Sequence, residues 1–301
     1  MLCSEMMYKK ADRKTREALI GNLLMDYGFL SRDTIGESRC SRPIDLLCIG
    51  NRKNQVLFTG AYHGMEWITS LLLLRFVDEL CYSVITGRSM CGVKMGSILN
   101  RRGIAIIPCV NPDGVEIQIN GADSAGDYRD VVINACKGNT SVWQSNAAGV
   151  DINHNFSANW EQLHRLENKN GITCASPTRF GGEYPESEPE SRTVASYCRT
   201  GHIAHAIALH SQGEEIYWSF GDYNDDEAYK MARIMSCSSG YKVSDTNGLA
   251  YGGGFKDWFE EHFKRPAFTV EVGKGRNPLP VSQLDSIYEK IREMLVLAVV
   301  L

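Results

Sequence analysis

Residues 55–84 read QVLFTGAYHGMEWITSLLLLRFVDELCYSV, and this stretch decides the fold class. Gln55–Thr59 is a short apolar run rich in residues that favour strands. From Trp67 to Val84 the apolar residues recur at helical spacing. A buried strand followed directly by a long helix predicts an α/β protein, because such a helix covers one face of the sheet that contains the strand.

The same alternation recurs along the chain. Further strands are predicted at Ile44–Ile49, Ile104–Val110, Ile203–Leu209 and Ala267–Val272, and further helices at Ser187–Tyr197 and Val281–Val300. Asn111-Pro112-Asp113-Gly114 predicts a turn, and the polar residues 121–148 predict a long loop. We therefore expect an α/β fold with a mixed, largely parallel twisted sheet and helices on both faces. A site is expected at the carboxyl ends of its strands.

No linker or internal repeat divides the 301 residues. Residues 46–301 are predicted to form a single domain that carries the functional site. Residues 1–45 are predicted to form an N-terminal extension packed on this core. A helix is expected within it, because Arg13–Tyr27 places its leucines and isoleucine at helical spacing.

The composition narrows the possible partners and the compartment. Hydrophobic residues make up 43% of the chain, charged residues 23%, and the net charge is −4. With no basic tract, neither nucleic acid nor a membrane is the expected partner. The ten cysteines are scattered without a CxxC pair, which favours a reducing cytosol. Met1–Arg16 has no apolar signal core, so a cytoplasmic location is expected.

A candidate metal site follows the first buried strand. His63 and Glu66 stand three residues apart at a strand-to-helix turn, where both side chains can reach one ion. His210 ends another predicted strand and is the best candidate for the third ligand. Zinc favours such nitrogen and oxygen ligands, and catalytic zinc sites use three of them plus water. The sequence therefore predicts Zn²⁺ as the cofactor.

Each of these residues also has an ordinary structural interpretation. His63 alone could be a turn histidine bonded to backbone, and His210 alone a hydrogen-bonded histidine at a strand end. His202 and His205 lie earlier in the same strand and are taken as structural. His-x-x-Glu by itself is a weak signal, because a chain of this length can contain one by chance.

Five motifs in order strengthen the hypothesis. They are Gly60-Ala61-Tyr62-His63-Gly64-Met65-Glu66-Trp67, Asn111-Pro112-Asp113-Gly114, Gly149-Val150-Asp151-Ile152-Asn153-His154-Asn155-Phe156, His210-Ser211-Gln212-Gly213 and Phe268-Thr269-Val270-Glu271. In this order the chain resembles the zinc carboxypeptidase family of the carboxypeptidase A type, from about Leu46 to Pro280. The segments after His210 and Glu271 are most similar to its bacterial branch of γ-D-glutamyl-diamino acid peptidases.

The resemblance implies roles for these residues. His63, Glu66 and His210 would hold zinc, and Glu271 would be the catalytic base. Its apolar strand suggests partial burial, which raises the pKa of a carboxylate. Asp151 matches the family's aspartate that orients a zinc-bound histidine, here His63. From the residues alone, Asp151 could equally be a turn or cap residue.

The family pattern is broken where the substrate binds. The family has an arginine after the asparagine that corresponds to Asn153, and the two bind the terminal carboxylate. Here the next residue is His154, a shorter and pH-dependent partner. The family's oxyanion arginine is also missing. Asn146 is the candidate for a donor in its place, and the alternative is that zinc carries more of the charge.

The resemblance to the family implies two further substrate contacts. Leu249 stands where the family has a mobile tyrosine, and Tyr251, two residues on, is the candidate for that role, or it simply packs. Lys256 is aligned with the residue that lines the specificity pocket, where a cation would favour an acidic side chain such as that of diaminopimelate. A solvated lysine on a helix is the ordinary alternative.

The resemblance therefore implies a zinc metallopeptidase that cleaves γ-D-glutamyl-diaminopimelate bonds in small murein peptides from peptidoglycan, in the recycling of wall fragments. A conventional carboxypeptidase, a deacylase of the aspartoacylase type and a catalytically weak peptide-binding protein are the alternatives. The missing arginine after Asn153 speaks against the first, and Glu271 with a complete ligand set speaks against the last.

Overall fold

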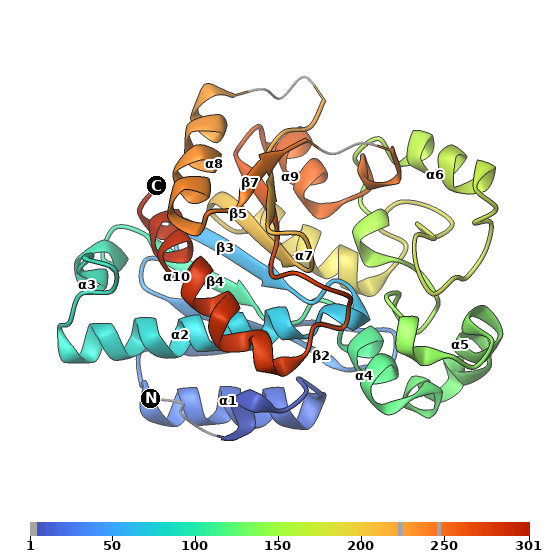
Figure 1. Ribbon diagram of the computed structural model, residues 1–301, viewed down its shortest axis with the longest axis horizontal. Helices are drawn as coiled ribbons and strands as arrows, with labels where there is room; N and C mark the ends of the chain where they lie inside the picture. Colours follow the sequence, from blue (N-terminus) through green and yellow to red (C-terminus); the bar gives the residue numbers. More distant parts are fainter. Residues whose placement is uncertain (1–4, 222–224, 246–247) are drawn as a thin grey trace.

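The computed structural model describes residues 5–221, 225–245 and 248–301, and within them a single sheet of eight strands forms the centre (Figure 1). The strands are β1 (Ser31–Glu37), β2 (Pro43–Ile49), β3 (Gln55–Gly60), β4 (Gly103–Ile107), β5 (Ile203–His210), β6 (Glu215–Tyr217), β7 (Lys242–Ser244) and β8 (Ala267–Glu271), in the spatial order β1-β2-β4-β3-β5-β8-β6-β7. The four central strands β4, β3, β5 and β8 run parallel. Antiparallel pairs join β1 to β2, β2 to β4 and β6 to β8. The expected mixed α/β sheet is confirmed.

Helices cover both faces of this sheet (Figure 1). They are α1 (Arg13–Asp26), α2 (Ile68–Thr86), α3 (Met95–Leu99), α4 (Pro112–Asn120), α5 (Arg129–Cys136), α6 (Trp160–Lys169), α7 (Pro189–Thr200), α8 (Asp226–Ser239), α9 (Phe255–Phe263) and α10 (Leu284–Val300). In the part of the chain that the structure describes, none of the helices has the length and apolarity to cross a membrane.

Alternate residues of the central strands enter two separate cores. In β3, Val56 and Phe58 pack in the core that α1, α2, α8 and α10 close. Leu57, between them, packs in the core that α7 and α9 close. Because successive side chains of a strand point to opposite faces, a strand covered on both sides must be apolar throughout, as Gln55–Gly60 largely is.

Two predictions between β4 and β5 were wrong. Asn111-Pro112-Asp113-Gly114 does not form an isolated turn but begins α4. Asn111 is its N-cap and accepts a hydrogen bond from the N–H of Gly114 over 2.8 Å, and Pro112 occupies the first turn, where it needs no N–H partner. Residues 121–148 are not one long loop. They contain a 3-10 segment, Ala122–Tyr128, and the short helix α5.

The N-terminal 45 residues contribute to the sheet itself. The expected helix is present as α1, which lies against α2. A strand that was not predicted, β1, pairs with β2 along its whole length and forms one edge of the sheet. The predicted boundary between residues 45 and 46 falls inside β2.

The carboxyl ends of β3, β5 and β8 meet at one edge of the sheet. Gly60 at the end of β3 pairs with Leu209 of β5, and His210 pairs with Glu271 at the end of β8. Parallel neighbours therefore bring the turn after β3, His210 and Glu271 together, although 144 residues separate Glu66 from His210 and 61 separate His210 from Glu271.

Candidate metal centre and active site

Close backbone contacts shape the turn that carries His63 and Glu66. Gly64–Glu66 forms a single 3-10 turn, η2, between β3 and α2. The N–H of Gly64 donates to the carbonyl of Gln144 over 2.9 Å. A Cβ at Gly64 would lie 2.3 Å from the carbonyl oxygen of Gly114. Only glycine allows the turn to approach Gly114 this closely.

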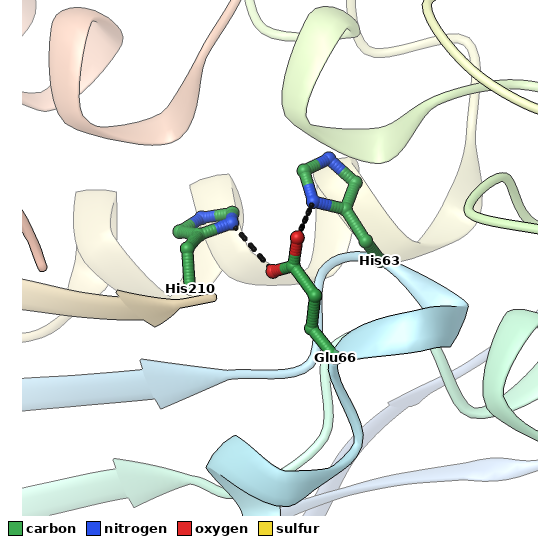
Figure 2. Close-up of side chains that lie close together, drawn as sticks. All are labelled: His63, Glu66 and His210. Carbon is green, nitrogen blue, oxygen red and sulfur yellow. Dashed lines mark hydrogen bonds and ion pairs between the residues drawn. The ribbon is translucent and has the colours of Figure 1, made fainter. Parts of the chain in front are cut away.

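His63, Glu66 and His210 point toward one another (Figure 2). Nδ1 of His63 lies 2.9 Å from Oε1 of Glu66, and Nδ1 of His210 lies 3.0 Å from Oε2. One ligand atom from each residue lies within 4.8 Å of the other two. Tetrahedral zinc with bonds of about 2.0–2.2 Å holds its ligand atoms about 3.3 Å apart. The donor set and its spacing therefore fit zinc.

Asp151 holds the ring of His63 from its other side. Nε2 of His63 lies 3.1 Å from Oδ1 of Asp151, so Nδ1 faces the other two candidate ligands. The same carboxylate accepts the backbone N–H groups of Asn153 and Arg179, at 3.1 and 2.8 Å. Burial would raise the pKa of Asp151, but the charge of His63 outweighs it and the pKa falls below its ordinary value. An ionised carboxylate in this position fixes the tautomer that leaves Nδ1 free for a metal.

His210 is oriented differently. It is 1% exposed, and its ring stacks on that of Tyr62 with the centroids 5.3 Å apart and the planes inclined by 12°. Its Nε2 has no hydrogen-bond partner among the described residues. Burial would raise the pKa of Glu66, but the two histidines lower it to about 2, which keeps this carboxylate ionised.

Glu271 lies beside the candidate metal ligands. It is the register partner of His210 between β5 and β8, and it lines the same cavity as His63 and His210. Burial, reinforced by the charge of Glu66, holds the pKa of Glu271 well above its usual range. A carboxyl group with a raised pKa can accept and return a proton near neutral pH.

Comparison with known proteins agrees with this geometry. Residues 17–294 match the family described as zinc carboxypeptidase. The chain belongs to the zinc carboxypeptidase family. It is 36% identical over 274 residues to gamma-D-glutamyl-L-diamino acid endopeptidase 1 of Lysinibacillus sphaericus, an alignment that covers 90% of this chain and 67% of the relative. The protein is therefore a zinc metallopeptidase, a hydrolase.

Solved structures share the fold of this zinc carboxypeptidase. Carboxypeptidase A from Helicoverpa armigera gives a TM-score of 0.75 at 19% identity, over 97% of this chain and 73% of that chain. Murein-tripeptide amidase MpaA from Escherichia coli O157 gives a TM-score of 0.55 at 18% identity, over 89% of this chain and 91% of that chain. At these identities the comparison shows the fold alone.

Three of the predicted substrate-binding residues line the cavity beside the candidate metal ligands: Asn153, His154 and Lys256. Oδ1 of Asn153 accepts the backbone N–H of Phe255 over 3.0 Å, which ties the turn before α9 to this wall. Nδ1 of His154 lies 2.8 Å from Oε1 of the fully buried Glu167. A carboxylate thus balances any positive charge on His154 from behind.

Lys256 is not a solvated surface lysine. It is 3% exposed, its Nζ lies 2.6 Å from Oδ1 of Asp257 and 3.1 Å from Oε2 of Glu260, and it donates to the carbonyl of Ser219. Burial alone would lower the pKa of Lys256, but the two carboxylates raise it above its ordinary value. The lysine is therefore a buried cation with two acidic neighbours, at the wall of the cavity.

The other two predicted substrate contacts lie elsewhere. The amide group of the fully buried Asn146 donates to Glu188 over 2.7 Å and to Glu190 over 3.1 Å. Both of its N–H groups are thereby used, so the prediction of Asn146 as an oxyanion donor does not match its position. Tyr251 packs on Phe220 and accepts the N–H of Gly221, outside the residues that line the cavity. Leu249 lines the cavity instead.

Sequence reasoning missed several residues of the cavity wall. They include Gln144, Thr178, Arg179 and Tyr217. Arg179 and Thr178 belong to the irregular segment between α6 and α7, whose sequence carries no periodicity that would place it. In the structure, the hydrogen bond from the backbone of Arg179 to Asp151 is one of the contacts that place this segment beside the candidate metal site.

Proposed function

We propose that this zinc metallopeptidase hydrolyses γ-D-glutamyl-meso-diaminopimelate bonds, or γ-D-glutamyl bonds to another diamino acid, in small murein peptides. The observation that carries the proposed reaction is that His63, Glu66 and His210 converge, and that the partly buried Glu271 lines the same cavity as the two histidines. The substrate class is supported by the similarity to the Lysinibacillus sphaericus endopeptidase, whose name gives this bond.

The residues of the site would have different roles in the proposed hydrolysis. Zinc held by His63, Glu66 and His210 would polarise the scissile carbonyl and make bound water acidic. Glu271 would accept the proton of the attacking water and pass it to the nitrogen of the leaving amine. Asp151 would keep His63 in its metal-binding tautomer.

The buried charges at the cavity wall support a diamino acid as the leaving group. The distal end of diaminopimelate carries an ammonium and a carboxylate. Lys256 can pair with the carboxylate. Asp257, which lines the cavity beside Lys256, can pair with the ammonium. Buried charges need opposite charges close by, so a zwitterionic ligand that supplies one to each residue would bind favourably.

A cytoplasmic role in recycling wall fragments is part of the proposal. The nine cysteines of the described residues are free thiols, and several, such as Cys81 and Cys198, are buried in the cores. Free thiols in such number fit a reducing compartment.

The decisive experiment is hydrolysis of L-Ala-γ-D-Glu-meso-diaminopimelate by the zinc-loaded protein, with and without a chelator, beside Glu271→Gln. We expect cleavage that the chelator abolishes and that Glu271→Gln lowers about 10²- to 10⁴-fold. Glu161→Gln, on the exposed surface of α6, is the matched control and should keep full activity.

Two outcomes would count against the proposal. Release of ordinary C-terminal residues, with the murein peptide uncut, would indicate a conventional carboxypeptidase. Cleavage of neither class, with zinc bound at one ion per chain, would indicate a different acyl substrate or a binding role.

A further inference from the structure

Within the described part of the chain, one cation at the wall of the cavity has no acidic partner. Among the described residues that line it, the positively charged side chains are Arg179 and Lys256, beside the histidines. Lys256 is paired with Asp257 and Glu260. The exposed guanidinium of Arg179 has no ion pair or side-chain hydrogen bond with any residue that the structure describes. We propose that Arg179 is the carboxylate-binding residue of this enzyme, and that it replaces the arginine missing after Asn153.

The backbone of Arg179 is anchored at the metal site. Its N–H donates to Oδ2 of Asp151 over 2.8 Å, and the N–H of Asp151 donates to the carbonyl of Phe180 over 2.7 Å. Oδ1 of the same aspartate contacts His63 and the N–H of Asn153. One buried carboxylate therefore holds a metal ligand, the asparagine of the family motif and Arg179 together.

The segment around Arg179 is fixed at both ends as well. Before it, the carbonyl of Pro177 accepts the N–H groups of Gln144 and Ser145, at 2.8 and 3.1 Å. After it, the N–H of Gly181 donates to Glu167 over 3.2 Å. The backbone of Arg179 is thus held in place, and binding of a ligand has to order only the side chain.

The backbone conformation at Arg179 is unfavourable for a residue with a side chain. Its φ is +65°, in the left-handed region that favours glycine. Such a conformation costs on the order of 1 kcal/mol and is concentrated at functional sites. Here it accompanies an N–H that reaches Asp151 and a side chain that borders the cavity, which gives the strained position a chemical purpose.

His154 is less suited than Arg179 to bind the carboxylate of a substrate. It stands where the family has its arginine, but its Nδ1 already has a partner in the buried carboxylate of Glu167, 2.8 Å away. A guanidinium offers two parallel N–H groups to one carboxylate and stays charged at every relevant pH, whereas an imidazole does neither. Arg179 is therefore the better partner for the carboxylate next to the cleaved amide, on the leaving amino acid. The identity of that amino acid rests on the proposed function.

The test compares two ligands that differ in a single group. Meso-diaminopimelate, with the carboxylate of its L centre free or converted to a carboxamide, is titrated into the zinc-loaded protein by calorimetry. We expect the wild type to bind the free acid about 10- to 100-fold more tightly, as for a charged hydrogen-bonded pair. Arg179→Met should lose this preference and Arg179→Lys should keep part of it. Arg101→Met should behave as wild type, because Arg101 is also exposed and its guanidinium has no ion pair with any residue that the structure describes.

The outcomes separate this inference from the proposed function. A preference for the acid that survives in folded Arg179→Met overturns the role of Arg179. A wild type that binds acid and amide equally, or binds neither, overturns it too. Cleavage of the murein peptide is scored separately, so loss of that activity would count against the proposed substrate and leave the binding result to decide on Arg179.

Discussion

Replacement of Asp151 by asparagine tests how much this carboxylate contributes to metal binding through His63. Asp151 is 1% exposed, and its Oδ1 lies 3.1 Å from Nε2 of His63. Asparagine has nearly the same shape but only one acceptor oxygen. If that oxygen keeps the bond to His63, the new N–H₂ group meets the N–H of Arg179, now 2.8 Å from Oδ2. Two donors would then face each other.

The magnitude follows from the bonds that change. A charge-assisted hydrogen bond is about twice as strong as a neutral one, so its conversion costs about 1–2 kcal/mol. Partners of metal-bound histidines generally contribute a factor of about 10 to 100 in metal affinity. We therefore expect Asp151→Asn to weaken zinc binding by about 10- to 100-fold, with a parallel fall in kcat/KM at limiting zinc.

Zinc affinity is measured by competition with a chromogenic chelator at fixed pH, and the fold is checked by circular dichroism and thermal unfolding. Asp33→Asn is the control. Asp33 is also paired with a cation, Arg52, but its side chain is half exposed and it lies in the edge strand β1. It should leave the zinc affinity unchanged. If folded Asp151→Asn binds zinc as tightly as wild type, Asp151 does not orient His63 and the argument from its hydrogen bonds is refuted.

Three further predictions concern stability and the shape of the site. Arg42→Met removes the ion pair of 2.5 Å to the buried Asp113 and should cost about 3 kcal/mol in urea unfolding, with part recovered in the double variant with Asp113→Asn; a cost below about 1 kcal/mol would contradict it. Burial raises the pKa of Glu190 from 4.5 to about 8, so folding takes up a proton between these values and stability should fall as pH rises through them. Glu190→Gln should flatten that decline by up to a few kcal/mol, seen as Tm against pH, and an unchanged slope would argue against the shift. Gly64→Ala would place a Cβ 2.3 Å from the carbonyl of Gly114 and should lower stability by about 1–3 kcal/mol and weaken zinc binding, whereas Gly96→Ala, with open space around it, should leave zinc binding unchanged; normal zinc affinity in Gly64→Ala would contradict the shape argument.

The sequence by itself determined the parts of the molecule that depend on local pattern. The apolar run of β3 and the helical spacing of α2 predicted an α/β sheet, because periodicity reports which faces are buried. The candidate zinc ligands were also accessible, since His63 and Glu66 are neighbours in the chain and His210 ends a recognisable strand. The family motifs then indicated Glu271 and Asp151.

Local pattern failed where polar residues satisfy one another over long distances. Asn146 was a plausible donor in the sequence, but two buried carboxylates, Glu188 and Glu190, take up its N–H groups. Lys256 could have been a surface lysine, yet the fold buries it beside two acids. Such polar pairs form between segments that meet in space, so they cannot be predicted from the spacing of residues along the chain.

Only the tertiary structure placed Arg179. Its segment has no periodic pattern, and its closeness to the metal site arises from hydrogen bonds between two irregular segments, through Asp151 and Phe180. Periodicity specifies the strands and helices because their burial repeats at fixed intervals. Irregular segments are positioned by individual backbone hydrogen bonds, which have no repeat. The sequence therefore indicated the chemistry of the metal, whereas the arrangement of charges that would recognise a substrate emerged only from the folded chain.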